Sequence, residues 1–502
     1  MRWPSVSSFV DFLHLPVGVD ALQLAVEDLA EWTAALAAWH PDLAIGEEAA
    51  LLQPQTYVEQ AALRDVEAGE AREMYTLILR SGSGAERRIV AGIVVEYDPH
   101  EATMAGRMSV VSPAWRGRGL GRVLLRGQEA LGRALGARSE WGLVELDNAP
   151  QQHLLESEGF WLCGIVPECD QRRGPDGQAR YVPEALYIKP LVPLSDLYVP
   201  QRSQLEPDVA AMFDRLQLPG ASSRSEDRGQ SSASGAMGGA VLDAACAVAV
   251  PSIPVLSPAL LALFAGRPAG VWPDLDALLR HPDCDLGLPQ GVCLRLQTAD
   301  DIAALTGPNG LLARWHPRLL DGTGRMFATA EHHRDSVALA GDRGRDVAIA
   351  DRPYGHLLLC RGEQILAFLA FSVDAPGVNL FGDLAVVDPA QQGQGQMVRM
   401  TRALLWIAAA LGVETVLGWA TLTHVGAQRV ARRAGLSLWG IVPASEVLVA
   451  DDGHVRLAFE ALYGASLIPP SQAHWPAPDR VPPRLRSLMQ LVRQGRGDVA
   501  GA

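Results

Sequence analysis

The feature that most constrains the fold of this chain is an internal repeat. Three short strings occur twice, each pair 276 residues apart: WHP at Trp39 and Trp315, GIVP at Gly164 and Gly440, and EALY at Glu184 and Glu460. From Arg107 to Pro193 the second copy follows the first without a gap, and about a third of the aligned positions are identical. Such self-similarity predicts one structural unit that is built twice.

The repeat predicts two domains and a linker. The predicted parts are an N-terminal domain at 1–218 with its core at about 17–195, a linker at 219–269, and a C-terminal domain at 270–496 with its core at about 290–470. Helices are expected to flank both cores. The linker is rich in Ser and Gly and then in Ala and Pro, a composition typical of flexible connections, and its residues 219–240 are expected to be poorly ordered. The two domains are expected to pack on each other.

Each copy shows the same order of predicted elements. In the first copy these are a strand and amphipathic helix within 20–40, a helix at 47–63, strands at 74–80, 88–97 and 107–112, a helix at 121–136, a strand at 142–148, a helix at 150–159, and a hairpin of strands at 160–168 and 181–188. The strands are rich in β-branched and aliphatic residues, whereas the helices carry apolar residues at helical spacing. This order predicts an α+β fold in which helices flank a mixed sheet.

A glycine-rich stretch stands where the strand at 107–112 meets the next helix. It reads SVVSPAWRGRGLGRVLLRGQ from Ser109 to Gln128. Glycines at a helix N-terminus let backbone N–H groups approach an anion, and the helix dipole favours negative charge there. Alternatively, the stretch is a surface turn with solvated arginines, because a short glycine-rich run alone has low specificity.

The order of elements and two motifs resemble the GCN5-related N-acetyltransferases, the GNAT superfamily. The first motif is V-x-P-x-x-R-G-x-G-x-G after a strand, and the second is Asn148, eleven residues before Gly159 and Phe160. The resemblance covers most of each copy. It implies two tandem GNAT-like acyl-CoA N-acyltransferase domains, each with a mixed, splayed sheet and flanking helices.

The resemblance also implies a binding site for acetyl-CoA as co-substrate. In this family the loop amides and the helix N-terminus hold the pyrophosphate, and the Asn binds the pantetheine arm. The implied cofactor-binding residues are Val111, Arg116, Gly117, Arg118, Gly119, Leu120, Gly121 and Asn148. No metal ion is expected.

The second copy departs from both motifs. Its loop reads QGQGQM from Gln392 to Met397, without arginines, and His424 replaces the Asn. A Met side chain at this turn is expected to crowd a pyrophosphate. The second copy is therefore interpreted as a structural partner that covers a sheet edge or shapes the acceptor cleft, while a second cofactor site stays open as the alternative.

The sequence lacks the family's usual catalytic tyrosine and offers several candidate bases. Many family members carry a Tyr seven residues after the Asn to protonate the leaving thiolate, but Leu155 and Ala431 stand there. A carboxylate is the usual base for an amine. The family's fourth-strand carboxylate falls on Arg107 in the first copy and on Asp383 in the second. The candidate bases are Glu145, Glu96 and Asp383. Solvated strand-end charges remain the alternative for the two glutamates.

Composition excludes several classes of partner. The net charge of −14 argues against nucleic acid, whose phosphates need a positive face. Six cysteines without metal-like spacing favour a reducing, cytoplasmic location, and neither a signal peptide nor a membrane span is expected.

The resemblance and its motifs imply an N-acyltransferase that moves an acetyl group from acetyl-CoA to a primary amine of a small molecule or peptide. A non-catalytic acyl-CoA-binding or scaffold protein is the alternative.

Overall fold

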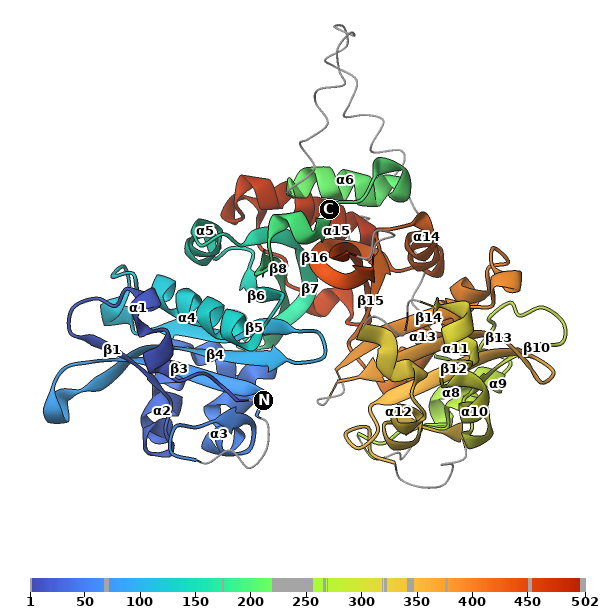
Figure 1. Ribbon diagram of the computed structural model, residues 1–502, viewed down its shortest axis with the longest axis horizontal. Coiled ribbons are helices and arrows are strands. Elements are labelled where there is room, and N and C mark those ends of the chain that lie inside the picture. The colour runs from blue at the N-terminus through green and yellow to red at the C-terminus, as the bar shows by residue number, and fades with distance from the viewer. Residues whose placement is uncertain are drawn as a thin grey trace, which may run out of the picture. The chain divides into compact units, whose positions relative to one another are not determined.

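The computed structural model describes residues 2–66, 72–173, 176–218, 256–264, 268, 270–317, 319, 323–340, 347–374, 378–449 and 454–496. The chain forms two compact units. Unit 1 consists of Met1–Asp196 and Pro470–Met489, and unit 2 of Leu197–Pro469 and Gln490–Ala502 (Figure 1). Most of the predicted linker at 219–269, including 219–240, lies outside the described residues.

A mixed β-sheet forms the centre of unit 1. Its strands are β1 (Val19–Gln23), β2 (Ala61–Ala62), β3 (Met74–Ser81), β4 (Arg88–Asp98), β5 (Thr103–Val111), β6 (Ser139–Glu145), β7 (Trp161–Arg173) and β8 (Ala179–Pro190). They pair in the order β1-β3-β4-β5-β6-β8-β7. The β5–β6 pair is parallel, as is the short pair of β2 with β3, and the others are antiparallel. The predicted mixed sheet is confirmed.

Helices cover both faces of this sheet. They are α1 (Val10–Leu13), α2 (Leu29–Trp39), α3 (Pro54–Gln60), α4 (Leu120–Leu135) and α5 (Ala149–Ser157), with short 3-10 turns η2 (Val26–Asp28), η4 (Glu47–Leu52) and η6 (Pro113–Trp115) among the connections. One core cluster joins Leu124 of α4 to Ile93, and a second joins Trp32 of α2 to Val94. Because neighbouring residues of a strand point to opposite faces, α4 and α2 cover opposite faces of the sheet.

The segment at 47–63 differs from the single helix predicted there. It forms the turn η4, then α3, and finally the short strand β2. Pro54 is the first residue of α3. Proline lacks a backbone N–H and its ring clashes with the preceding turn, so one helix cannot run through this position, whereas a new helix can begin at it.

Unit 2 repeats the strand order of unit 1. Its strands are β9 (Leu197–Tyr198), β10 (Val292–Leu296), β11 (Val337–Ala338), β12 (Tyr354–Arg361), β13 (Gln364–Val373), β14 (Asn379–Val387), β15 (Thr415–Thr421), β16 (Ser437–Val449) and β17 (Val455–Ser466). The order is β10-β12-β13-β14-β15-β17-β16, and among these strands only β14 and β15 run parallel. Two short strands add parallel pairs, β9 with β17 and β11 with β12.

The described helices of unit 2 flank this sheet. They are α6 (Pro207–Leu216), α8 (Pro258–Ala262), α9 (Leu275–Arg280), α10 (Ile302–Leu305), α11 (Leu311–Trp315), α12 (Ala330–Asp335), α13 (Gln396–Leu411) and α14 (Val425–Ala434). The last described helix, α15 (Pro483–Arg496), begins in unit 1. No helix within the described ranges is long and apolar enough to cross a membrane.

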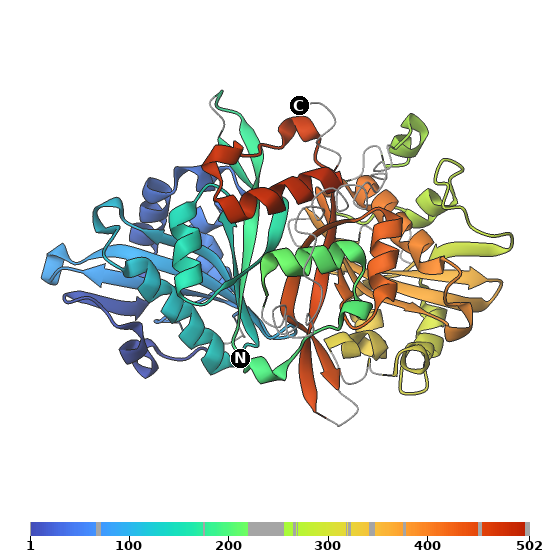
Figure 2. The same ribbon diagram turned by 90° about the horizontal axis from the view of Figure 1, so that it is seen from above.

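The units exchange the segments that follow their sheets, so their boundaries differ from the predicted 1–218 and 270–496. Helix α6 belongs to unit 2, where Glu206 at its N-cap accepts a hydrogen bond of 2.8 Å from Arg429. Residues 470–489, part of the red segment in Figure 2, belong to unit 1, where Arg484 donates a hydrogen bond of 2.7 Å to the hydroxyl of Tyr187. The amphipathic pattern of a helix predicts that one face is buried but does not specify the sheet that buries it.

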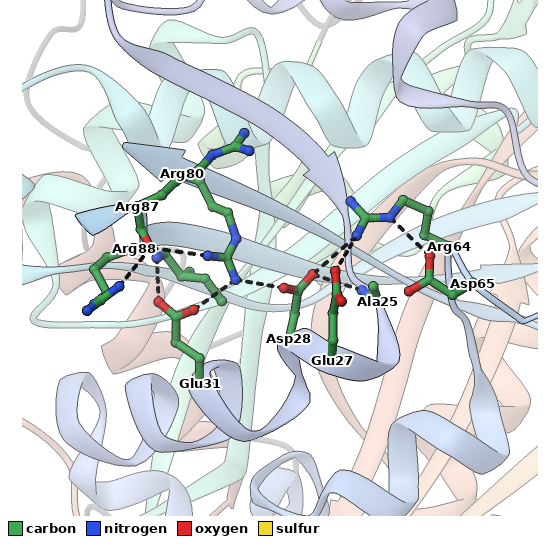
Figure 3. Close-up of polar contacts among 10 residues, drawn as sticks. Ala25, Glu27, Asp28, Glu31, Arg64, Asp65, Arg80, Arg87 and Arg88 are labelled. Atoms are coloured by element: carbon green, nitrogen blue, oxygen red, sulfur yellow. Dashed lines mark hydrogen bonds and ion pairs between the residues drawn. The ribbon is translucent and has the colours of Figure 1, made fainter. Parts of the chain in front are cut away.

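Ion pairs fasten the start of α2 to the sheet of unit 1 (Figure 3). Arg80 of β3 lies 2.7 Å from Asp28 and 2.8 Å from Glu31. Both carboxylates have a second role, because Asp28 accepts a hydrogen bond from the N–H of Ala25, and Glu31 accepts one from the N–H of Ile89. The side chains of Arg80 and Asp28 are only 12% and 9% exposed.

Replacing Arg80 with Met is expected to lower the free energy of unfolding by about 3 kcal/mol, because two carboxylates lose their cation in a poorly solvated place. Urea denaturation of the full chain measures this change. The control is Arg180→Met, whose ion pair with Asp176 is exposed and should contribute less than about 1 kcal/mol. Equal losses from both substitutions would contradict the importance of the Arg80 pairs.

Three buried histidines occupy the core of unit 2. His333 of α12 and His356 of β12 are fully buried, and their Nδ1 atoms lie 3.0 and 2.8 Å from Oε1 of Gln297. The ring of His332 lies beside both, at centroid distances of 5.8 and 5.6 Å. Burial lowers the pKa of all three, that of His332 to about 4. In the described part of the chain, no group of three or more His, Cys, Asp or Glu side chains is arranged to hold a metal ion.

Acid is therefore expected to destabilise unit 2. Below the ordinary histidine pKa of about 6.5 the unfolded chain binds protons that the folded core does not, so stability is fully present above this pH and is lost as the pH falls. For His332 alone the loss is roughly 2 kcal/mol by pH 5. Urea unfolding at pH 7 and pH 5 measures it, with His332→Phe as the variant whose loss should be smaller. An identical pH dependence in both proteins would be inconsistent with this account.

Candidate active site in unit 1

The sheet of unit 1 opens between its two long parallel strands. β5 and β6 pair from Thr103 with Ser139 to Gly106 with Gly142, and within the described ranges the pairing goes no further. Beyond this point β5 continues to Val111 and β6 to Glu145. These two strand ends, 107–111 of β5 and 143–145 of β6, pair with β4 and β8 but not with each other, and the gap between them is called the wedge.

The predicted glycine-rich loop connects β5 to α4 at this wedge. Gly117 and Gly119 have φ angles of +75° and +81°, and a Cβ atom added at either would meet nothing within 4 Å. Among the described residues, no acceptor binds the N–H groups of Gly117, Arg118 or Gly119. Gly119 is the N-cap of α4, which has 16 residues and no acidic side chain in its first turn. The loop therefore presents free donors at the positive end of a helix dipole.

Two arginines stand beside these donors. Arg116 donates a hydrogen bond of 3.3 Å to the carbonyl of Val111, and the guanidinium of Arg118 lies 4.5 Å from the ring centroid of Trp115. Both arginines are exposed. These contacts hold two positive charges next to the loop without neutralising them.

The first residues of α4 have mainly structural side-chain environments. Leu120 is 1% exposed, so only its backbone can face a ligand at the loop. A Cβ atom at Gly121 would lie 2.8 Å from Cδ2 of Leu154. Gly121 therefore permits the close approach of α4 to α5, a role that the motif alone does not reveal.

Asn148 begins α5, just beyond the end of β6. Its Oδ1 accepts a hydrogen bond of 3.3 Å from the N–H of Gln151, which makes it the N-cap of the helix. The residue is exposed. Because the amide oxygen caps the helix, the amide nitrogen remains as a donor.

The candidate base Glu96 is held by an arginine. Arg107 occupies a bulge of β5, forms an ion pair with Glu96, and lies 2.7 Å from Glu48 of η4. Burial raises the pKa of Glu48, although Arg107 opposes this effect. The predicted carboxylate position of the fourth family strand is thus filled by a cation between two carboxylates.

The candidate base Glu145 is also ion-paired, with Arg172 of β7. Directly opposite Glu145 in the β6–β8 register lies Glu184, whose strand β8 also pairs with β7. Burial and then the charge of Asp170 raise the pKa of Glu184 to about 8. In the sequence Glu184 stands out only as the first residue of the repeated EALY string. It is not among the predicted bases, because its position near the wedge depends on strand register.

The positions of the absent tyrosine are part of the core. Leu155 is 3% exposed and Ala431 is 7% exposed. Neither side chain can supply a proton. Within the two copies, this position therefore contributes packing alone.

Unit 2 repeats the backbone conformation of the loop, but here an arginine side chain is hydrogen-bonded to the loop. Gly393 and Gly395 have φ angles of +77° and +75°. Arg399 donates hydrogen bonds of 3.0 Å to the carbonyl of Gln394 and 2.9 Å to that of Gly287, and so bridges the loop to another segment. Met397 is only 7% exposed and so lies in the interior instead of on the exposed loop, contrary to the expected crowding.

The other predicted residues of unit 2 have local partners. Asp383 occupies the bulge of β14 that corresponds to Arg107 and accepts a hydrogen bond of 3.1 Å from Ser372. Nδ1 of His424 accepts a hydrogen bond of 3.1 Å from the N–H of Gly426 at the start of α14. His424 therefore reproduces the helix cap of Asn148 but presents a ring in place of an amide.

Comparison with known proteins identifies part of unit 1. Residues 46–160 match the model of the Acetyltransferase (GNAT) family. A curated relative, streptothricin acetyltransferase of Streptomyces lavendulae, is 30% identical over 105 residues, which cover 21% of this chain. The match spans only about half of that relative, 53% of its length.

A comparison with solved structures matches parts of this chain to proteins described as acetyltransferases. Nourseothricin acetyltransferase is 23% identical, with 24% of this chain and 66% of that chain covered and a TM-score of 0.21. The ribosomal-protein-S18-alanine N-acetyltransferase of Escherichia coli is 18% identical, with 36% and 99% covered and a TM-score of 0.27. The yncA protein of Salmonella typhimurium, solved with its cofactor acetyl-CoA, is 18% identical, with 37% and 98% covered and a TM-score of 0.27.

Proposed function

We propose that this chain, whose residues 46–160 belong to the GNAT acetyltransferase family, transfers an acetyl group from acetyl-CoA to a primary amine. The observation that carries the proposal is the loop of unit 1. Its unpaired N–H groups at Gly117, Arg118 and Gly119 stand at the N-terminus of a long helix, beside a sheet that opens at the end of β5.

The residues of this loop fit a diphosphate. The open space at Gly117 and Gly119 allows a phosphate oxygen to approach the backbone, and Arg116 and Arg118 add positive charge in an acidic protein. The backbone of Val111, Leu120 and Gly121 and the amide nitrogen of Asn148 complete the proposed site for acetyl-CoA. Acetyl-CoA supplies an activated thioester, and the chain supplies orientation and a proton acceptor.

The proposed acceptor is a primary amine of a small molecule or peptide that carries positive charge. Several carboxylates of unit 1 lie close together. In addition to burial, Glu96 and Asp170 raise the pKa of Glu48, and Asp170 and Glu48 raise that of Glu184. The similarity to streptothricin acetyltransferase supports a small-molecule acceptor, because the name of that relative denotes one.

Unit 2 is proposed to be a structural partner that does not bind acetyl-CoA. Arg399 already bridges its loop, and His424 replaces the Asn148 amide. In this proposal Asp383 has no role in catalysis. An active second site would make Asp383 the first candidate for its base.

The alternative is a non-catalytic acyl-CoA-binding or scaffold protein, which the absence of a tyrosine acid favours. Turnover separates the two functions. The full chain is incubated with acetyl-CoA and a panel of amines: an aliphatic diamine, lysine and a tripeptide with a free amino terminus. Amine-dependent release of CoA supports the transferase, whereas calorimetric binding of acetyl-CoA with no release for any amine supports the scaffold.

A further inference from the structure

A strained bulge in β7 lies next to Glu184. In the β7–β8 register Val166 lies opposite Glu184 and Asp170 lies opposite Val182, so Pro167 to Cys169 form an irregular insertion. Within it, Glu168 has a φ of +48°, a left-handed conformation that is costly for a residue with a side chain. Ala444 of unit 2 stands at the corresponding place with a φ of +57°. Both units maintain this strain.

The bulge and the strand register determine the surroundings of Glu184. Cys169, the last residue of the bulge, forms a hydrogen bond with the Glu184 carboxyl group. Because Glu184 and Glu145 are directly opposed, their side chains point to the same face of the sheet, at the end of the wedge. The charged groups that face Glu184 are Asp170 and Arg172 from β7 and Glu48 from η4.

Ion pairing distinguishes Glu184 from the bases that the sequence predicts. Glu145 is bound by Arg172, and Glu96 is bound by Arg107. A carboxylate in contact with a guanidinium is a weak proton acceptor, because the neighbouring positive charge stabilises its ionised form. Glu184 forms no ion pair within 4 Å of a described arginine or lysine, although the nearby charge of Arg172 lowers its pKa and partly opposes the effect of burial.

We propose that Glu184 accepts the proton of the attacking amine in unit 1, an inference that rests on the proposed acetyl transfer. The amine nitrogen forms a bond to the carbonyl carbon of the thioester, the carbon–sulfur bond breaks, and CoA leaves as the thiolate. The proton lost by the nitrogen passes to the Glu184 carboxylate, directly or through one water molecule, and then to solvent. Glu145 and Arg172 position the neighbouring strand ends.

The surroundings of Glu184 suit this role. Glu184 is only partly exposed. A carboxyl group that is largely withdrawn from water and faces other carboxylates holds a proton more firmly than a fully exposed one, so its carboxylate is a stronger base toward an amine. Its carboxylate becomes available as the pH rises toward 8. The rate of acetyl transfer is therefore expected to rise through this range and then reach a plateau.

The test compares Glu184→Gln with Glu184→Asp and with Glu460→Gln, the same substitution at the corresponding position of unit 2. Glu184→Gln should lower kcat by about 10²–10⁴-fold and remove the rise near pH 8, while the Kd of acetyl-CoA stays within about twofold. Glu184→Asp should retain the inflection with a reduced kcat. Glu460→Gln should behave as the wild type.

A readout without ligand accompanies the kinetics. Between the ordinary glutamate pKa and about 8 the folded chain holds a proton on Glu184 that the unfolded chain releases, so this residue makes stability fall as the pH rises. Glu184→Gln should remove that part of the pH dependence of urea unfolding.

The possible outcomes separate this inference from the proposed function. No turnover of any amine by the wild type would overturn the acetyl transfer itself. Wild-type turnover with an unchanged kcat and pH profile in Glu184→Gln would overturn the role of Glu184. If Glu145→Gln or Glu96→Gln instead removes the inflection, that residue is the proton acceptor and Glu184 is not.

Discussion

Replacing Gly119 with Glu is expected to abolish the binding of acetyl-CoA to this chain. Gly119 is the N-cap of α4, its φ is +81°, and the space where a Cβ would stand is open. The new carboxylate would occupy that space, repel a diphosphate, and distort the backbone that presents the free N–H groups. Isothermal titration of the full chain with acetyl-CoA should show no measurable heat of binding.

Two matched glycines serve as controls. Gly395 is the corresponding N-cap in unit 2, and Gly136 is the C-cap of α4, with a φ of +78° and no neighbour within 4 Å of an added Cβ. Glutamate at Gly136 carries a similar strain of about 1–2 kcal/mol but lies at the other end of the helix. Both controls should bind acetyl-CoA almost as the wild type does. Equal losses in Gly119→Glu and Gly395→Glu would show two working sites instead of one.

Deleting Pro470–Ala502 is expected to unfold unit 1 and, with it, the acetyl-CoA site, although this segment follows the core of the second copy. Within 470–489 the side chains of Val481, Leu485, Leu488 and Met489 are at most 2% exposed. Burying each contributes about 1.5–3 kcal/mol, so their sum approaches the whole stability of a typical domain. Arg484 also leaves Tyr187 and Glu156, its partners in unit 1.

Thermal melting and acetyl-CoA titration of the truncated chain test this expectation. The control is Arg480→Ala, which removes an exposed arginine and its ion pair with Asp147 but leaves the apolar side chains in place, and it should shift the melting temperature by much less than the deletion does. Normal acetyl-CoA binding by the truncated chain would contradict the assignment of 470–489 to unit 1.

The sequence predicts those parts of the fold that depend on local patterns. Segments rich in β-branched and aliphatic residues indicate β3, β4 and β5, and the helical spacing before Gly136 indicates α4. Gly117 and Gly119 are predictable for the same reason, because a positive φ at a helix start favours glycine. The repeat at a fixed offset predicts the common strand order of the two units.

Other features depend on contacts between distant segments. Arg172 lies 27 positions after Glu145, and only the β7–β8 hairpin brings its guanidinium back to that carboxylate. The position of Glu184 follows from strand register and from a bulge at 167–169, neither of which has a sequence signal of its own. The exchange of α6 and of residues 470–489 between units is likewise invisible to periodicity, because both helices have an ordinary amphipathic face.

Acetyl transfer at the glycine-rich loop of unit 1 is tested most directly by following the acetyl group itself. The full chain and Gly119→Glu are incubated with acetyl-CoA and each amine of the panel, and both the released CoA thiol and the mass of the amine are recorded. For at least one amine the wild type should release one thiol for each acetyl group gained by that amine, and Gly119→Glu should do neither. Thiol release that is independent of amine, or an acetylated amine formed equally well by Gly119→Glu, would contradict an acetyltransferase site at the loop of unit 1.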